Sequence, residues 1–226
     1  MSKEKNLLKI TWKTEILSII FVVVSFVASI YFYLNFPDKV PVHWNIYGNP
    51  DNWASKEFGA FFFPALILIM YVGLIFTPYL DPKREQYKNF ADIYNIFRTI
   101  MTGFMTVIYF LTGFAGIGYN VQIGVWVPVL IGMLFIVIGN YMGKIKSNWM
   151  FGNKNMWTLS SEEVWNKSNR MGGKALIVGG LLMALDGLVN DYMWKTIIFV
   201  IAILVIILVP NIYSYIIFNQ EKNKTK

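Results

Sequence analysis

Two uncharged stretches of about membrane length stand out in the hydrophobic pattern of the first eighty residues. Ile16–Leu34 contains no charged residue, and Phe58–Leu80 is a second such run. A helix needs about 20 apolar residues to cross the hydrocarbon core, so each run predicts one transmembrane helix. The first run exceeds the roughly 7–15 apolar residues of a signal peptide and lacks a cleavage site after it, so we expect it to remain as an anchor.

The longest uncharged stretch lies in the middle of the chain. No charged residue occurs between Arg98 and Lys144, a stretch about twice as long as one crossing requires. The polar residues Asn120 and Gln122 lie at its centre. We therefore predict two helices joined by a tight turn near Tyr119–Gln122.

The last two predicted spans differ in strength. Ala175–Leu185 is short, and the acidic residue Asp186 follows it directly. Thr196–Gln220 is long enough to cross, and Pro210 predicts a kink near its end.

Composition supports a membrane protein. Hydrophobic residues make up 56% of the chain and charged residues only 15%, against roughly 25% charged in soluble domains. The net charge of +7 could indicate nucleic-acid binding, but the positions of the lysines follow a membrane topology instead. The absence of cysteine and the single histidine exclude disulfides, thiolate metal sites and multi-histidine metal sites, so we expect no cofactor.

Basic residues predict the orientation, because cytoplasmic loops carry an excess of lysine and arginine. Only Lys39, Lys56 and Lys195 fall on one side of the predicted spans. The other side carries Lys3, Lys5, Lys9, Lys13, Lys83, Arg84, Lys88, Arg98, Lys144, Lys146, Lys154, Lys167, Arg170, Lys174, Lys222, Lys224 and Lys226. We therefore predict an all-α polytopic membrane protein with six transmembrane helices and both termini in the cytoplasm.

This topology predicts four parts of the chain. Residues 1–64 form an N-terminal membrane domain with the first span and an external loop. Residues 65–128 hold the second and third spans with a basic cytoplasmic loop. Residues 129–220 hold the last three spans with a large cytoplasmic loop, and residues 221–226 form a basic tail.

The external loop between the first two spans is rich in turn-forming and aromatic residues. Its prolines and Gly48 exclude a continuous helix, and Tyr47–Asp51 has the composition of one or two turns. One interpretation is a loop that its aromatic residues anchor to the bilayer interface. The other is a recognition surface for an arriving molecule. Its residues would be Pro41, His43, Trp44, Asn45, Gly48, Asp51 and Trp53.

Catalysis in this loop is the weaker hypothesis. His43 and Asp51 could serve as an acid–base pair, but no nucleophile or second base accompanies them. We therefore expect no enzyme.

The large cytoplasmic loop, Lys144–Lys174, contains a helix-start pattern. Ser160 and Glu163 fit a capping box, which predicts a short amphipathic helix over Ser161–Met171 on the inner membrane surface. Gly172-Gly173 is expected to end it. This helix could simply tie two spans together, or the loop with its exposed tryptophans could form a docking surface for a cytoplasmic protein or anionic lipid.

Polar signals inside the spans are few. Gly139 and Gly143 form a small-xxx-small pair that would allow two helices to approach closely. Asp186 is the one acid inside a predicted span; it is expected at the outer interface, with a functional role as the alternative. The pattern of polar midplane residues or broken helices expected of a channel or transporter is not visible.

Two parts of the chain resemble known families. The run Gly139-Asn140-Tyr141 … Asn148-Trp149 … Gly152 … Trp157-Thr158-Leu159-Ser160 … Trp165 … Asn169-Arg170 resembles the SdpI family of bacterial immunity proteins. Pro41-Val42-His43-Trp44-Asn45 … Gly48 … Asp51 … Trp53 resembles the short membrane domain of unknown function that often precedes it. The resemblances cover roughly Phe21–Pro64 and Val129–Ile212.

The chain departs from the family pattern at one point. The proline that usually comes shortly before the position of Trp157 is missing, whereas the basic charge is kept at Lys154. The resemblance implies that the signature residues of the cytoplasmic loop are Gly139, Asn140, Asn148, Gly152, Lys154, Trp157, Thr158, Leu159, Trp165, Asn169 and Arg170.

The resemblance also implies a function. Family members protect a bacterial cell against its own secreted peptide toxin, and one type also recruits a cytoplasmic transcriptional repressor to the cell membrane. The partners would be the lipid bilayer, a peptide toxin and a repressor, with no direct contact to nucleic acid. A small transporter or lipid-interacting membrane factor is the alternative. The identity of the toxin, the oligomeric state and the role of Asp186 stay open.

Overall fold

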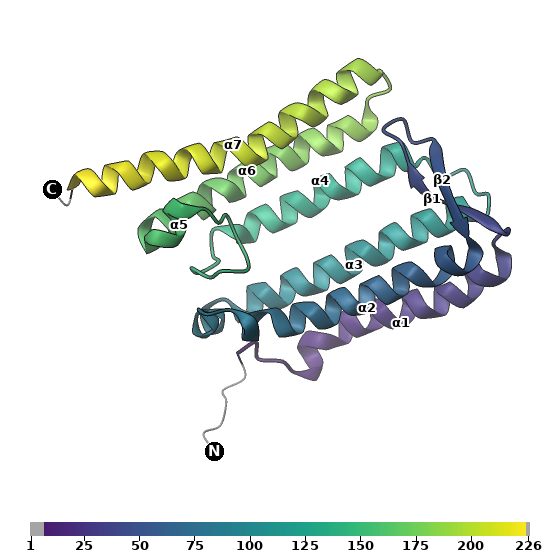
Figure 1. Cartoon of the computed structure of the whole chain (residues 1–226), viewed down its shortest axis with the longest axis horizontal. Coiled ribbons are helices and arrows are strands. Elements are labelled where there is room, and N and C mark those ends of the chain that lie inside the picture. Colours follow the sequence, from purple (N-terminus) through teal and green to yellow (C-terminus); the bar gives the residue numbers. More distant parts are fainter. Residues whose placement is uncertain (1–6, 225–226) are drawn as a thin grey trace.

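The computed structural model describes residues 7–224. Within this part the chain forms six long helices that are apolar enough to cross a membrane, so the protein is a multi-pass membrane protein (Figure 1). The long helices are α1 (Trp12–Asn35), α2 (Lys56–Leu80), α3 (Ala91–Gly116), α4 (Ile123–Met142), α6 (Glu162–Leu188) and α7 (Tyr192–Lys224). The shorter elements are β1 (Lys39–Trp44), β2 (Pro50–Ser55), the 3-10 helix η1 (Arg84–Asn89) and α5 (Met156–Ser160).

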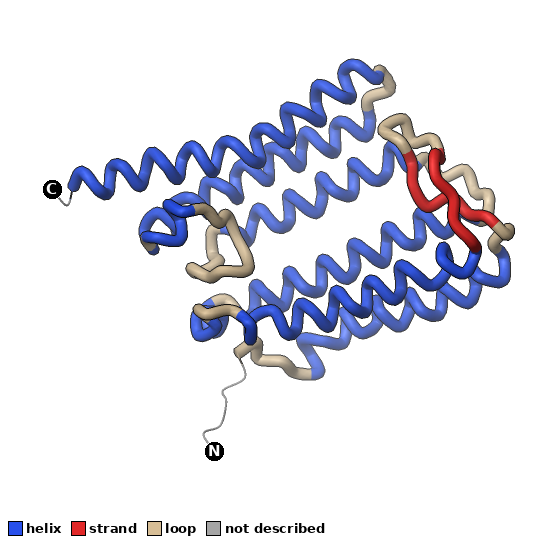
Figure 2. The backbone as a smooth tube through the Cα atoms, in the orientation of Figure 1, coloured by secondary structure: helices blue, strands red, loops and turns tan. Residues whose placement is uncertain are grey.

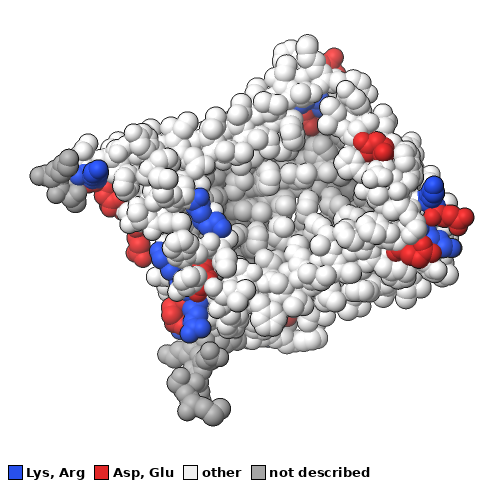
Figure 3. Space-filling model, in the orientation of Figure 1, with Lys and Arg blue, Asp and Glu red and all other residues white. Residues whose placement is uncertain are grey.

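The long helices form two groups of three. The first bundle contains α1, α2 and α3, and in the second bundle α6 lies between α4 and α7 (Figure 1). The molecular surface is hollowed between α3 and α4, where the two bundles face each other (Figure 3). Each bundle therefore has its own interior, and contacts near the two ends of the helices hold the bundles together.

Charged side chains gather at the two ends of the helices and leave an uncharged band between them (Figure 3). Helix α1 begins and α7 ends at the same end, which we name the basic end (Figure 1). The strands lie across the opposite end, named the hairpin end (Figure 2). The six predicted spans are thus confirmed, whereas the cytoplasmic location of the basic end stays a prediction. Lys3, Lys5 and Lys226, which entered that prediction, lie outside the described residues.

Aromatic side chains fill the interior of the first bundle. The buried ring of Phe32 stacks on Phe36 at 5.5 Å and meets Tyr109 edge-on at 5.4 Å. Gly113 of α3 makes room for this ring, because a Cβ there would lie 2.3 Å from Phe32 Cζ. Side chains of one helix thus fit against small residues of the next.

The second bundle brings backbones together instead. A Cβ at Gly132 would lie 2.4 Å from the Gly180 carbonyl oxygen, and one at Gly139 would lie 2.6 Å from the Gly173 oxygen. The predicted close approach at Gly139 is confirmed, and Gly143 packs against Arg170. Helices α4 and α6 therefore meet along a line of glycines.

Two local predictions for α6 are wrong. Gly172-Gly173 does not end a short interfacial helix, because α6 continues through both residues and joins that helix to the predicted fifth span. Glycine weakens an isolated helix by about 1 kcal/mol, but here close packing against α4 and α7 favours it. The N-cap is Ser161, whose Oγ accepts from Val164 N at 3.3 Å, and not Ser160.

The loop after α1 also differs from expectation, because it contains strands. β1 and β2 form an antiparallel hairpin in which Val40 faces Ala54 and Pro41 faces Trp53. The register is irregular between Pro41 and His43 and between His43 and Trp44. Proline lacks a backbone donor and masked the strand pattern in the sequence, but it is tolerated in a strand with a free edge.

Candidate functional site

The hairpin (Lys39–Ser55) presents two candidate residues side by side on its surface. The His43 Nδ1 and Asp51 Oδ1 atoms are 2.5 Å apart, and the two side chains keep 64% and 41% of their surface exposed. An exposed pair of this kind contributes little to stability, because water screens it. These two polar groups therefore remain accessible to a ligand.

The tip of the hairpin is fixed by its own turn. Asn45 Oδ1 accepts hydrogen bonds from Tyr47 N at 2.9 Å and from Asn49 N at 3.1 Å. Gly48 has a φ of +77°, a left-handed conformation that favours glycine. The predicted turn is therefore confirmed, with Asn45 as the residue that organises it.

This tip also connects the two bundles. A Cβ at Gly48 would lie 2.8 Å from Gly124 N, at the start of α4. The rings of Tyr47 and Tyr192 are 4.4 Å apart, which places the tip against the start of α7. The hairpin begins and ends at the first bundle, and its tip packs against the second.

The seven predicted residues of the external loop divide into two groups. His43, Asp51 and Trp53 are exposed, whereas Pro41, Trp44, Asn45 and Gly48 are partly buried and shape the hairpin. Pro41 and Trp44 line a small cavity at the base of the hairpin, toward α3. A recognition role for this set stays a prediction.

At the basic end, the segment Gly143–Asn155, which we name the signature loop, folds around the side chain of Asn148. Its Oδ1 accepts from Met150 N at 2.9 Å and from Phe151 N at 2.6 Å. Its Nδ2 donates to the carbonyl oxygens of Lys146 and Phe151, both at 2.8 Å. Asn148 is fully buried, so its amide replaces secondary structure as the partner of these backbone groups.

Asp81 and Tyr87 tie the signature loop to the first bundle, and the sequence analysis missed both. Asp81 Oδ2 accepts from Trp149 N at 2.9 Å. The Tyr87 hydroxyl lies 3.1 Å from the same oxygen and 3.3 Å from Asn148 Oδ1. Burial, and after it the negative charge of Asp81, raises the pKa of Tyr87. The one sequence feature that could have indicated a role for Asp81 is its position at the end of a span, directly before Pro82.

Trp165 forms the centre of the apolar core beneath the loop. Its side chain is fully buried, and its Nε1 donates to the Ile145 carbonyl at 2.8 Å. Gly152 has a φ of +117°, and a Cβ there would lie 2.7 Å from Asn169 Oδ1 and 3.0 Å from the Trp165 ring. Trp165 is therefore not exposed for docking, because the loop covers it, and docking through other tryptophans stays a prediction.

Helix α5 stands where the family pattern has a proline. Asn155 caps this helix by accepting from Trp157 N at 3.0 Å and Thr158 N at 2.9 Å. Its Nδ2 donates to Asn211 Oδ1 and Ser214 Oγ of α7, both at 2.8 Å. The ring of Trp157 also packs 5.3 Å from Tyr215. A cap and its contacts with α7 thus define the turn without proline.

The remaining signature residues are dispersed. Lys154 Nζ donates to the carbonyls of Trp149 and Met150, which lie within the signature loop. Leu159 packs against the core around Trp165, whereas Arg170 is exposed. Asn140 is exposed, and its Nδ2 donates to the Ile136 carbonyl of its own helix. The signature is therefore mainly a scaffold around Asn148, Trp165 and Asn169.

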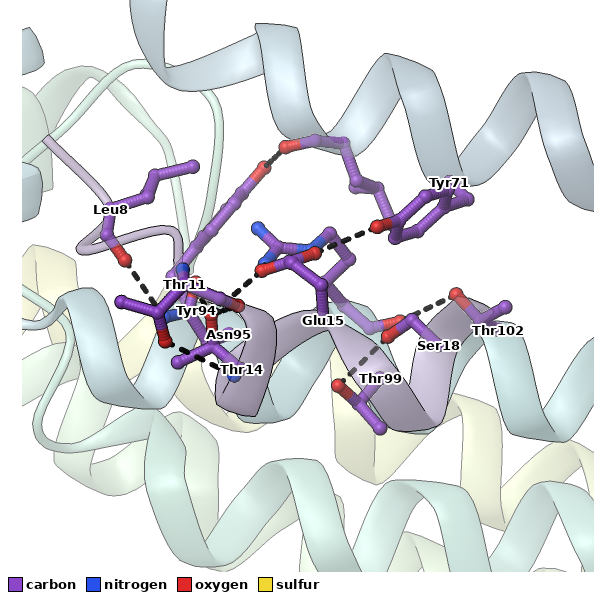
Figure 4. A network of polar contacts seen from close by, with 12 residues as sticks. Leu8, Thr11, Thr14, Glu15, Ser18, Tyr71, Tyr94, Asn95, Thr99 and Thr102 are labelled. Carbon is purple, nitrogen blue, oxygen red and sulfur yellow. Dashed lines mark hydrogen bonds and ion pairs between the residues drawn. The ribbon is translucent and has the colours of Figure 1, made fainter. Parts of the chain in front are cut away.

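A buried polar network connects the helices of the first bundle near the basic end. Glu15 of α1 forms an ion pair with Arg98 of α3, and both side chains are buried. The Tyr71 hydroxyl of α2 donates to Glu15 Oε2 at 2.8 Å, and Figure 4 shows the two side chains directed toward one another. Ser18 and Thr99 extend the network at 3.0 Å between their hydroxyls.

This network corrects two sequence expectations. Glu15 lies inside α1, so Asp186 is not the one acid within a span. Arg98, counted above among the basic residues of the cytoplasmic side, lies inside α3. Both were missed because the predicted spans were counted from uncharged runs, and a charge ended the run. The signal was present in the spacing of the polar positions 15, 18, 95, 98, 99 and 102, which face one side of their helices.

Comparisons with known proteins agree with the two resemblances. Residues 144–214 match the model of the SdpI/YfhL protein family, and residues 20–68 match a domain of unknown function, DUF1648. A curated relative, Immunity protein SdpI of Bacillus subtilis (strain 168), is 29% identical over 205 residues, which cover 90% of this chain and 95% of the relative. No solved structure matches the chain. The match to the SdpI/YfhL model thus covers nearly all of the signature loop, α5, α6 and most of α7, and the match to DUF1648 covers most of α1, the hairpin and half of α2.

Proposed function

We propose that this chain is an immunity protein of the bacterial cell membrane that protects its cell against a secreted peptide toxin. The similarity to Immunity protein SdpI along nearly the whole of both chains supports this proposal. The excess of basic residues at one end supports an orientation with the basic end in the cytoplasm and the hairpin outside. A toxin from outside would then meet the hairpin first.

The exposed surface of the hairpin is the observation that carries the proposal. His43, Asp51 and Trp53 offer a titratable ring, an acid and an apolar ring on one rigid element. The hairpin connects α1 to α2, and its tip contacts α4 and α7. Toxin bound at the tip would therefore act on both bundles. Rigid elements with exposed aromatic and charged groups are suited to recognition.

A toxin-sensitivity assay tests the proposal. A strain that lacks this gene should become sensitive to a peptide encoded beside it, and the intact gene should restore resistance. The variant His43→Ala with Trp53→Ala should insert normally and lose most protection. Tyr119→Ala is the matched control, because it removes another exposed aromatic ring at the hairpin end and should protect fully. Unchanged sensitivity of the deletion strain would contradict immunity and favour the transporter or lipid-interacting alternative.

Recruitment of a repressor is the second part of the proposal. Trp165 is covered, so the docking surface at the basic end would use the exposed side chains of Trp149 and Met156. The backbone N–H of Trp149 itself donates to Asp81 in the contact that joins the bundles, so a movement between the bundles would displace Trp149 directly. A fluorescently labelled repressor from the same gene cluster should move to the membrane when toxin is added. The variant Trp149→Ala with Met156→Ala should abolish this movement and keep protection; a repressor that stays in the cytoplasm of wild-type cells would contradict recruitment.

A further inference from the structure

A pocket of about 380 Å³ lies at the hairpin end, between the hairpin tip and the second bundle. Tyr47 of the hairpin, Pro128 of α4 and Phe199 of α7 form parts of its wall. The lining is almost entirely apolar, with Asp186 of α6 and Lys195 of α7 as its charged residues. Its volume is in the range of small-ligand sites and suits one or two large side chains.

Asp186 is the unusual member of this lining. Its side chain belongs to a residue that is only 4% exposed, and Oδ1 has no hydrogen-bond partner within residues 7–224. A buried carboxylate without a partner is costly, so such groups are normally paired or bind something. The buried Oδ1 atom of Asp186 is therefore a hydrogen-bond acceptor that the described residues do not satisfy.

Lys195 does not supply the missing partner. Its Nζ donates to the Gly124 carbonyl at 2.8 Å, and it acts on Asp186 only through its electrostatic field. Among the charged groups of the pocket, the lysine thus has a hydrogen-bond acceptor, whereas the acid lacks a donor. Asp186 could therefore accept a hydrogen bond from a donor, or bind a cation, that a ligand brings into the pocket.

We propose that this pocket binds an apolar peptide segment that carries a protonated amine, with Asp186 as the acceptor of the ammonium group. The apolar wall would receive the hydrocarbon part, and the rings of Tyr47, Tyr192 and Phe199 would lie around the cation. The proposal rests on the proposed function, because it assigns this pocket to the toxin. It extends that function from the exposed face of the hairpin to an open pocket beside its tip.

Binding of a fluorescent apolar amine tests the chemistry of the pocket directly. Dansylcadaverine joins an aromatic body to a primary amine, and its N-acetylated form keeps the body without the charge. Wild-type protein in phosphatidylglycerol nanodiscs should bind the amine saturably and bind the acetylated form at least tenfold more weakly. Asp186→Asn should weaken amine binding at least tenfold. Asp191→Asn is the matched control, because Asp191 is exposed at the same end, and it should bind normally.

A second variant keeps the test decisive if Asp186→Asn does not fold. Val200→Trp fills the pocket from α7 and should abolish saturable binding of the amine. Equal binding of the amine and its acetylated form, or unchanged binding by Asp186→Asn or Val200→Trp, would overturn the proposal. Nanodiscs that contain phosphatidylethanolamine decide the source of the amine: strong competition by this headgroup would overturn the assignment to a peptide.

Toxin protection separates this inference from the proposed function. Asp186→Asn should lose protection in cells, whereas Asp191→Asn should keep it. If wild-type protein protects and Asp186→Asn protects equally, the pocket assignment fails and immunity stands. If the deletion strain shows no change in sensitivity, immunity fails, and the amine-binding result alone then decides whether the pocket binds such ligands.

Discussion

The two bundles solve the same problem, helix packing in a membrane, by different means. The first bundle joins its helices through side chains, with the ring of Phe32 against Gly113 and with the buried pair of Glu15 and Arg98. The second bundle brings the backbones of α4 and α6 together at glycines such as Gly139 and Gly173. Lipid offers little hydrophobic drive for helix association, so either close packing or polar bonds must provide the attraction.

The difference predicts how each bundle tolerates change. A contact between side chains can be repaired by shortening one of them, whereas a contact between backbones has no side chain to shorten. A buried ion pair is sensitive to the loss of one partner, because the other charge stays in a medium where water cannot solvate it. The first bundle should therefore be destabilised most by the loss of a charged partner, and the second by added side-chain volume.

The largest expected effect is that of Arg98→Ala in the first bundle. It leaves the buried Glu15 carboxylate without its cation and should destabilise the protein by about 3–5 kcal/mol. Unfolding of the purified protein in mixed micelles measures this. Lys88→Ala is the control, because it removes an exposed pair with Glu85 and should cost under about 1 kcal/mol. The double variant Glu15→Gln with Arg98→Met should cost less than Arg98→Ala; an equal cost would contradict the charge argument.

The second prediction concerns volume in the second bundle. The Cβ of Gly173→Ala would lie 2.5 Å from the Gly139 carbonyl oxygen, so the helices must separate, at an expected cost of about 1–3 kcal/mol. Gly73→Ala is the matched control, because a Cβ at this position in α2 meets nothing within 4 Å. That variant should be neutral or stabilising in the same unfolding assay, since alanine favours helix. Similar losses for both variants would show that glycine flexibility, rather than close packing, is required.

A rescue experiment sharpens the comparison further. Gly113→Ala should destabilise the first bundle by about 1–3 kcal/mol, because its Cβ would overlap the ring of Phe32. Adding Phe32→Leu should recover about 1 kcal/mol of that loss, since the shorter side chain leaves room for the methyl group. If the double variant lost as much free energy of unfolding as the two single variants together, the shorter side chain would not relieve the overlap. The proposed difference between the bundles would then be wrong.

The smallest expected effect lies where the bundles meet at the basic end. Tyr87→Phe removes the hydroxyl near Asp81 and Asn148, at a cost of about 0.5–1.5 kcal/mol near pH 7. Burial raises the pKa of Tyr87, so above the unfolded pKa of about 10 the unfolded chain releases this proton first. The stability from the hydroxyl is therefore complete below about pH 10 and is lost as the pH rises through the folded pKa. Unfolding curves should show wild type losing stability more steeply than Tyr87→Phe above this pH; parallel slopes would contradict it.

The sequence predicted the membrane class and the six spans because both depend on lengths of apolar chain. A run such as Phe58–Leu80 has one stable solution in a bilayer, a helix with its backbone hydrogen bonds closed within itself. The turn organised by Asn45 and Gly48 was predictable for a similar reason, because asparagine and a glycine of positive φ define a turn locally. The resemblance to the SdpI family also came from the order of residues alone.

Only the tertiary structure decided the features that depend on a partner distant in sequence. Gly172-Gly173 has the composition of a helix end, but α4 and α7 pack against it and keep α6 continuous. Glu15 and Arg98 are charged, as loop residues often are, but each is the ion-pair partner that allows the other to be buried. Asp186 was expected at the outer interface, and only the arrangement of the hairpin, α4 and α7 places it in the wall of a pocket. Local order in the sequence thus determined which segments cross the membrane, because the bilayer acts on each segment separately; contacts between segments determined what the chain presents to a ligand.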